Sequence, residues 1–75
     1  MSGNHKVKSY KIFLYRSGDE IFELENTGGK IEYSNYEKIK KAKHNDVLAF
    51  KDIYAYIVGE ESARKLNDIT IRIVN

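Results

Sequence analysis

The chain has no cysteine, no proline and no tryptophan, and only two histidines, among its 75 residues. Without cysteine it has no disulfide framework, no thiol nucleophile and no cysteine-ligated zinc site. Long apolar segments are also missing, because the longest one free of charge, Ile53 to Val58, is far shorter than the ~20 residues that span a bilayer. The first eight residues lack the apolar stretch of a signal peptide. We therefore expect a cytoplasmic protein that does not act at a membrane.

The scarcity of histidine leaves little scope for catalysis or metal binding. His5 lies in the polar start of the chain and His44 follows a run of lysines, which is too little for a triad or a zinc site. Gly28-Gly29 matches neither a P-loop nor a dinucleotide fingerprint, and a turn explains it. We predict no catalytic residue, no metal and no cofactor, and thus no enzyme. One alternative retains catalysis, a small metal-independent ribonuclease that would use a tyrosine together with Lys41, Lys43, His44 and Arg64.

The small net charge of +2 conceals blocks of opposite sign. Residues 1–16 carry a net charge of +4, residues 17–37 carry −5, residues 38–43 carry +4 and the remainder carries −1. Such blocks either pair across neighbouring strands or form opposed surface patches. The sequence leaves both arrangements open.

Alternating apolar residues in the first half of the chain predict an antiparallel meander. After a flexible start over residues 1–8, we expect strands at 10–15, 20–25 and 30–33. The turns between them carry Ser17-Gly18-Asp19 and Asn26-Thr27-Gly28-Gly29, which are typical turn residues.

A short helix is predicted next, over residues 35–44. Ser34 and Glu37 have the spacing of a capping box, and lysines close the segment as the helix dipole favours. Its apolar stripe is narrow, so the helix needs to dock on the sheet, with Tyr36 and Ile39 as the expected anchors.

The second half of the chain predicts further strands. Residues 47–58 are rich in branched and aromatic side chains, so we favour two strands or one bent strand over a helix. Residues 60–66 carry two i, i+4 ion pairs and are predicted to form one or two helical turns. Residues 69–74 alternate strictly and predict a final strand. We place these side chains in the core: Phe13, Phe22, Phe50, Ile69, Ile71 and Ile73.

These segments together predict one α+β domain over residues 9–75. It consists of a small antiparallel sheet of five to six strands with one or two short helices. A small SH3-like barrel is the alternative, because short strands with polar turns can close on themselves.

Two groups of residues are candidates for binding a partner. The lysine cluster Lys38, Lys40, Lys41 and Lys43 suits phosphates or an acidic protein. Tyr54 and Tyr56 share one face of a predicted strand, and if Ile53, Ala55 and Ile57 on the other face are buried, both tyrosines are exposed anchors.

The function predicted from these residues is that of a small non-enzymatic protein-binding module. In size and lack of catalytic groups the chain is similar to small phage or mobile-element (viral) proteins that inhibit or regulate a larger host protein. The alternative is a nucleic-acid-binding protein that uses the Lys38–Lys43 segment. A homodimer is a further expectation, because a thin core and an isoleucine-lined terminal strand gain from pairing.

Overall fold

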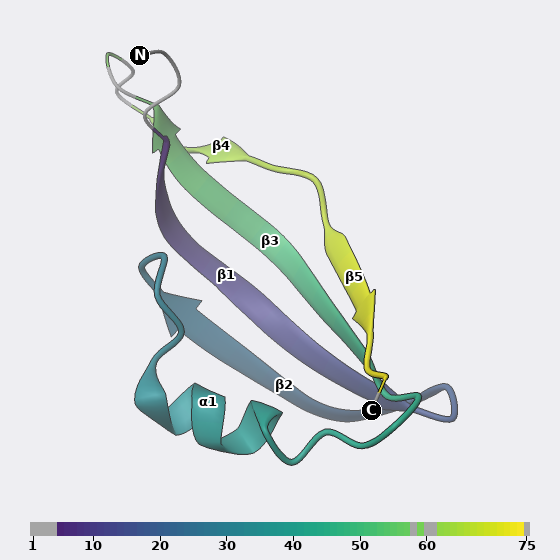
Figure 1. Ribbon diagram of the computed structural model, residues 1–75. Coiled ribbons are helices and arrows are strands. Elements are labelled where there is room, and N and C mark those ends of the chain that lie inside the picture. Colours follow the sequence, from purple (N-terminus) through teal and green to yellow (C-terminus); the bar gives the residue numbers. More distant parts are fainter. Residues whose placement is uncertain (1–4, 58, 60–61, 75) are drawn as a thin grey trace.

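A computed structural model describes residues 5–57, 59 and 62–74, with His5 described in its backbone only. These described residues form one antiparallel sheet and one short helix (Figure 1). The elements in chain order are β1 (His5–Arg16), β2 (Asp19–Thr27), α1 (Tyr33–Ile39), β3 (Val47–Ile57), β4 (Arg64–Lys65) and β5 (Ile69–Arg72). The sheet order is β2-β1-β3, and both β4 and β5 pair with the far edge of β3. The predicted α+β class with a five-stranded antiparallel sheet is therefore confirmed.

A tight hairpin joins β1 to β2, as the turn residues predict. Arg16 pairs with Asp19, so Ser17 and Gly18 alone form the turn, and both have positive φ, 52° and 84°. Two consecutive residues with positive φ match the right-handed twist of the flanking strands. β1 begins earlier than expected, because residues 5–7 pair with β3, whereas residues 1–4 of the expected flexible start lie outside the described residues.

The third strand predicted at residues 30–33 is wrong, and a buried asparagine explains why. Asn26 is 1% exposed, and its side-chain nitrogen donates to the carbonyl oxygen of Lys30 at 2.8 Å. Its side-chain oxygen accepts hydrogen bonds from the backbone N–H of Glu32 at 2.8 Å and from the side chain of Asn35 at 3.1 Å. These bonds hold residues 27–32 in a loop that leads directly into α1.

The helix itself differs from its prediction in bounds, cap and anchor. It spans Tyr33–Ile39 instead of 35–44, and its N-cap is Glu32, without a side-chain capping bond, so the predicted Ser34 cap is wrong. Tyr36 is 50% exposed, whereas Asn35 is buried and donates to the carbonyl oxygen of Glu25 at 2.8 Å. Ile39 does pack against the core, so Asn35 and Ile39 dock the helix on β2.

Residues 47–57 form a single strand, in agreement with the preference for strand over helix; Val58 lies outside the described residues. Asp52 has a positive φ of 50°, and the pairing with β1 shifts register near it. The inward positions change there from Leu48 and Phe50 to Ile53 and Ala55, because the irregularity adds a residue to the alternation.

In the last segment one predicted strand is confirmed, whereas the predicted helix and two predicted core positions are wrong. The predicted helix at 60–66 is wrong where it is described, because Arg64 and Lys65 form β4 beside Ala55 and Tyr54; residues 60 and 61 lie outside the described residues. β5 confirms the final strand. Ile69 and Ile71 are nevertheless 51% and 46% exposed, which corrects their assignment to the core; Ile73 does pack against it.

The core lies on one face of the sheet and is small. Its buried cluster consists of Tyr10, Ile12, Leu14, Leu24, Leu48 and Ile53. Phe22 and Phe50 pack against this cluster from partly buried positions, as expected. Phe13 lies on the opposite face of β1, where its ring stacks on Tyr15 with centroids 6.2 Å apart, so its predicted core position is wrong. In the part of the chain that the structure describes, no helix is long and apolar enough to cross a membrane.

Candidate binding surfaces

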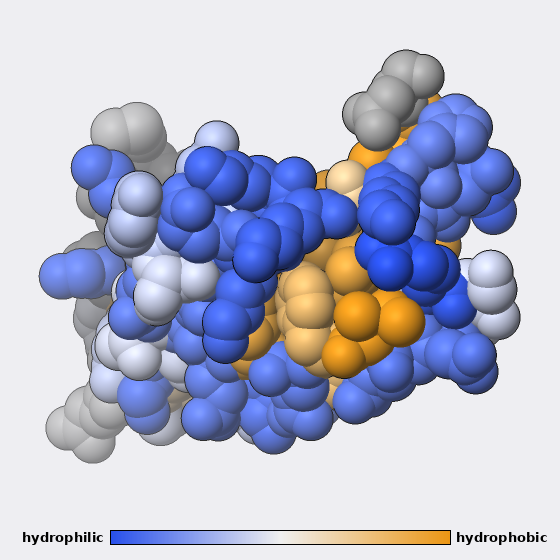
Figure 2. Space-filling view, turned by 90° about the horizontal axis from the view of Figure 1, so that it is seen from below, coloured by the Kyte–Doolittle hydropathy of each residue, from blue (hydrophilic) through white to orange (hydrophobic). Residues whose placement is uncertain are grey.

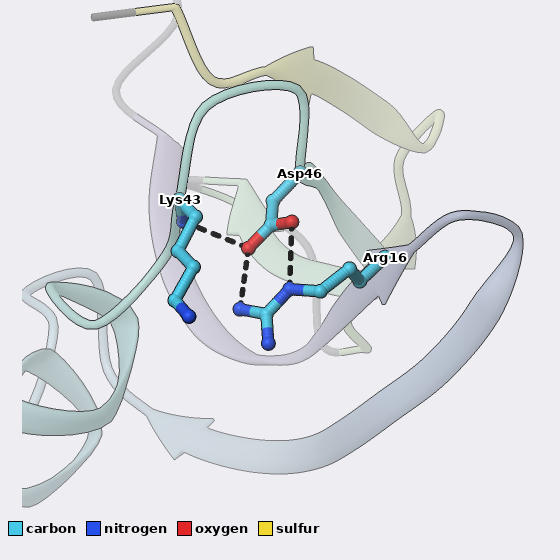
Figure 3. A network of polar contacts seen from close by, with 3 residues as sticks. All are labelled: Arg16, Lys43 and Asp46. Atoms are coloured by element: carbon cyan, nitrogen blue, oxygen red, sulfur yellow. Dashed lines mark hydrogen bonds and ion pairs between the residues drawn. The ribbon is translucent and has the colours of Figure 1, made fainter.

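The segment after α1 is fixed by a buried carboxylate. Asp46 is 2% exposed, and its two oxygens accept hydrogen bonds from Arg16 Nε at 3.0 Å and Arg16 Nη2 at 2.8 Å (Figure 3). The backbone N–H of Lys43 also donates to Oδ2, at 2.8 Å. The bidentate geometry is the strong form of the arginine–carboxylate pair. The Arg16 hydrogen bonds, followed by the Lys43 bond, lower the pKa of Asp46 to about 2, and Asp46 in turn raises the pKa of Arg16.

Backbone hydrogen bonds tie the same segment to the end of the chain. The N–H of Ile73 donates to the Asp46 carbonyl oxygen at 2.7 Å, and the N–H of Asn45 donates to the Ile73 carbonyl oxygen at 2.8 Å. Asn45 has a positive φ of 73°, a conformation that asparagine tolerates well. The segment 40–46 is therefore held between the end of β1 and the residues after β5, and its lysines have a fixed place.

A hollow of about 290 Å³ lies beside this segment, and we call it the lysine-rimmed hollow. It has apolar side chains from β1 and β2 and a cationic rim, and it is lined by Leu14, Ile21, Phe22, Arg16, Lys38, Lys41 and Lys43. Leu14 is 2% exposed and belongs to the core, whereas Ile21 is 47% exposed. The face seen from below accordingly shows a hydrophobic patch framed by hydrophilic side chains (Figure 2).

The structure brings three of the four predicted lysines to this hollow. Lys38, Lys41 and Lys43 line it, and none of the three forms an ion pair with another described residue within 4.0 Å. Lys40 is engaged elsewhere, because its ammonium lies 2.9 Å from Glu37 and 5.9 Å from the centre of the Tyr36 ring. The positive block at 38–43 is thus a surface patch concentrated at one apolar hollow.

Tyr54 and Tyr56 form a separate surface. They are 37% and 41% exposed while Ile53 and Ala55 are buried, so the predicted division of faces is confirmed. Tyr54 pairs with Ser9 and Tyr56 with Lys6, whereas the hollow lies at Leu14 and Arg16, near the other end of β1. The Lys8 ammonium lies 5.8 Å from the centre of the Tyr56 ring. The tyrosine pair and the lysine cluster are therefore not brought together.

A few residues of the other charge blocks pair across the sheet. Lys11 of β1 lies 3.7 Å from Glu23 of β2 and 3.8 Å from Asp52 of β3. Asp52 also contacts Lys65 of β4, at 3.1 Å. Its pKa is lowered, mainly by the hydrogen bond from Lys65. These charges are well exposed, so each pair contributes little stability, and of the acidic block at 17–37 the three pairs engage Glu23 alone.

The candidate ribonuclease residues do not converge. Lys41 and Lys43 line the hollow, and His44 is exposed in the segment before β3. Arg64 lies in β4 opposite Ala55, at the other end of β3. Among the residues that the structure describes, no group of three or more histidine, aspartate or glutamate side chains is placed to hold a metal ion.

Sequence reasoning missed the apolar half of the hollow. Regular alternation along residues 20–25 would place Ile21 on the face that carries Glu23 and Glu25. The pairing with β1 shifts at this point, since Leu14 pairs with Phe22 and Tyr15 with Glu20, which leaves Ile21 as the extra residue of a β-bulge. A bulge redirects a side chain out of the regular alternation. The available signal was an isoleucine among acidic residues close to a turn.

Comparison with known proteins finds no match to this chain. No protein-family model matches the chain, and neither a curated protein nor a solved structure matches it. The chain's own residues, above all the lysine-rimmed hollow, are therefore the basis for a functional assignment.

Proposed function

We propose that this chain is a non-enzymatic protein-binding module, which inhibits or regulates a larger protein by docking one of its acidic segments. The segment places a hydrophobic side chain in the lysine-rimmed hollow and acidic side chains against its rim. One observation supports this proposal above the others. Lys38, Lys41 and Lys43 gather around Ile21 and Phe22 without an acidic partner among the described residues.

The chemistry of the hollow favours a protein over a nucleic acid. A half-exposed aliphatic side chain such as Ile21 gains from burial under an apolar group, at about 25 cal/mol per Å². Phosphate binding needs the cations alone, and base stacking needs exposed aromatic rings, which the lining offers only in Phe22. The three lysines supply steering toward an acidic partner, and the apolar side chains supply the anchor pocket.

Charge-reversal variants test the cationic rim. The probe is a fluorescein-labelled peptide with a central phenylalanine flanked on both sides by glutamates, followed by polarisation. K38E/K41E is expected to weaken binding about tenfold or more, because attraction becomes repulsion at the rim. The matched control K6E/K30E makes the same change in net charge at exposed lysines outside the hollow and is expected to weaken binding much less. Equal losses in the two variants would contradict the assignment to the hollow.

A second pair of variants separates a protein partner from a nucleic acid. Ile21→Ala is expected to weaken peptide binding several-fold, whereas Ile31→Ala, at an isoleucine of similar exposure elsewhere, leaves it unchanged. Labelled single- and double-stranded DNA and RNA are measured in parallel at low salt. The contrary result is nucleic-acid binding that requires Lys38 and Lys41, weakens steeply as salt is added and is unchanged in Ile21→Ala. Such binding would contradict a protein partner and identify a nucleic acid instead.

The anchoring role of Tyr54 and Tyr56 stays a prediction for a separate contact. Both side chains are exposed on the face opposite the core, so Y54A/Y56A is expected to fold normally. Binding of the short acidic peptide is expected to survive this change because the tyrosines do not line the hollow. Only a full-length partner would lose affinity.

A further inference from the structure

β5 is an edge strand whose apolar side chains are half exposed. All four of its residues are exposed, although Ile69 and Ile71 point toward the core side of the sheet, opposite Phe50 and Leu48. The two isoleucines line an apolar groove of about 250 Å³, together with Val7, Tyr10, Gly29, Phe50 and Ile53. Its apolar surface extends to the free edge of the sheet.

The backbone of β5 leaves hydrogen-bonding groups at that edge. The N–H of Ile73 donates to Asp46 of the neighbouring strand segment at 2.7 Å, so the alternate residues Ile71 and Ile69 also bond toward β3. The N–H and C=O groups of Thr70 and Arg72 consequently point away from β3. Within the described residues no further strand pairs with them. Unpaired groups of this kind are a template for another strand.

We propose that β5 pairs antiparallel with β5 of a second copy of this chain, around a two-fold axis at Thr70. In this register Thr70 lies opposite Thr70 and exchanges both of its backbone hydrogen bonds. Ile69 of each copy lies opposite Ile71 of the other, and Asp68 lies opposite Arg72. The pairing therefore matches apolar with apolar residues and acid with base, twice each, which is the self-complementarity that a two-fold interface requires.

The opposite edge of the sheet lacks this self-complementarity. β2 carries Glu23 and Glu25 on one face, so antiparallel pairing with itself brings like charges opposite or close to each other. Charged edge strands of this kind resist pairing. The structure thus singles out β5 as the edge for a second copy, and the dimer is independent of the lysine-rimmed hollow because no residue of β5 lines it.

A charge swap tests the proposed register. D68R and R72D each place like charges opposite one another twice, so each is expected to raise the dimer dissociation constant about tenfold or more. The double variant D68R/R72D restores both pairs with reversed sign and is expected to recover the wild-type constant. Within one extended strand these residues are ~13 Å apart, so rescue reports a contact between copies. Analytical ultracentrifugation measures the constants; a double variant as weak as the single ones contradicts the register.

The absence of cysteine allows a second, independent test. Thr70→Cys introduces a single thiol whose counterpart in the second copy lies ~5.5 Å away between α-carbons, within the range of a disulfide. Mild oxidation is expected to cross-link this variant fully and much faster than Thr27→Cys, a control at an exposed position of β2. Cross-linking at equal rates, or a wild-type chain that stays monomeric at the highest attainable concentration, would overturn the proposal.

Discussion

At the scale of single residues, three buried polar side chains decide the local structure. Asn26, Asn35 and Asp46 are 1%, 8% and 2% exposed. Among the described residues that are not themselves exposed, no buried side-chain nitrogen or oxygen lacks a hydrogen-bond partner. Asn26 and Asn35 join the loop after β2 to α1, and Asp46 joins the end of β1 to the segment before β3. A satisfied buried polar group fixes one conformation, because every alternative leaves it without partners.

Asp46 is expected to make stability depend on pH in the acid range. Its pKa of about 2 in the folded chain lies below the ordinary value of 3.8, so the unfolded state binds more protons between these values. The free energy of unfolding therefore rises with pH; the contribution is complete above about pH 5 and is lost as the pH falls toward 2. Asp46→Asn is expected to lower stability at neutral pH and to flatten this slope. Urea unfolding followed by circular dichroism at several pH values measures both.

The matched control for Asp46 is Glu25→Gln, at an exposed carboxylate of β2. This variant is expected to keep the acid slope of the wild type, because no described residue forms an ion pair with the Glu25 carboxylate. A slope that survives in Asp46→Asn, or disappears in Glu25→Gln, would show that another carboxylate governs the acid stability.

Asn26→Ala is expected to destabilise the fold by about 2–3 kcal/mol. The substitution leaves the Glu32 N–H, the Lys30 carbonyl and the Asn35 side chain without their partner in a buried place. Asn67→Ala, at an exposed asparagine, is expected to change stability by less than about 0.5 kcal/mol. Chemical denaturation compares the two; a similar small loss in both would mean that water replaces the Asn26 bonds.

Whether a single side chain is buried or exposed can be predicted from the sequence only where a strand is regular. Burial of Ile53 and Ala55 with exposure of Tyr54 and Tyr56 follows from the two-residue period of a strand. The buried polar residues could not be predicted, because aspartate and asparagine are also the usual residues of turns and caps. The partner of Asp46 is Arg16, 30 positions away, and no local pattern records such a contact.

At the scale of elements, β1, β2, β3 and β5 were predictable, whereas the bounds of α1 and the strand β4 were not. β1, β2 and β3 have nine or more residues each, enough to show the composition and alternation of strands. The helix predicted at 60–66 rested on two i, i+4 ion pairs, which contribute only a few tenths of a kcal/mol each. The edge of β3 offers Arg64 and Lys65 backbone hydrogen bonds, and this tertiary pairing overrides the weak local preference.

Ser34→Ala tests the observed start of α1. The helix begins at Tyr33 with Glu32 as N-cap and has no side-chain capping bond, so this substitution is expected to cost less than about 0.5 kcal/mol. Glu32→Ala is the comparison, because the Glu32 carboxylate accepts the Thr27 N–H at 2.9 Å, and its loss is expected to cost about 1 kcal/mol. Thermal or urea unfolding measures both. A cost near 1 kcal/mol for Ser34→Ala would restore the capping box that the sequence suggests.

At the scale of the whole molecule, the charged residues are arranged in two ways: some form ion pairs across the sheet, and others form a surface patch. The outer face of the sheet pairs Lys11 and Lys65 with acidic side chains of neighbouring strands. The lysines of residues 38–43 instead gather, with the exception of Lys40, at the lysine-rimmed hollow. The lysine cluster was visible in the sequence, but the apolar lining of the hollow was not. Ile21 lines the hollow because a β-bulge redirects its side chain, and Leu14 lines it because the sheet brings β1 beside the lysines.

The most direct test of the proposed docking site is a map of amide chemical shifts during titration of the isotope-labelled chain with the acidic phenylalanine peptide. The account predicts saturable shifts concentrated at Ile21, Phe22, Lys38, Lys41 and Lys43, with Tyr54 and Tyr56 unmoved. Shifts centred on the tyrosine pair or on β5, or no saturable shifts at all, would contradict it.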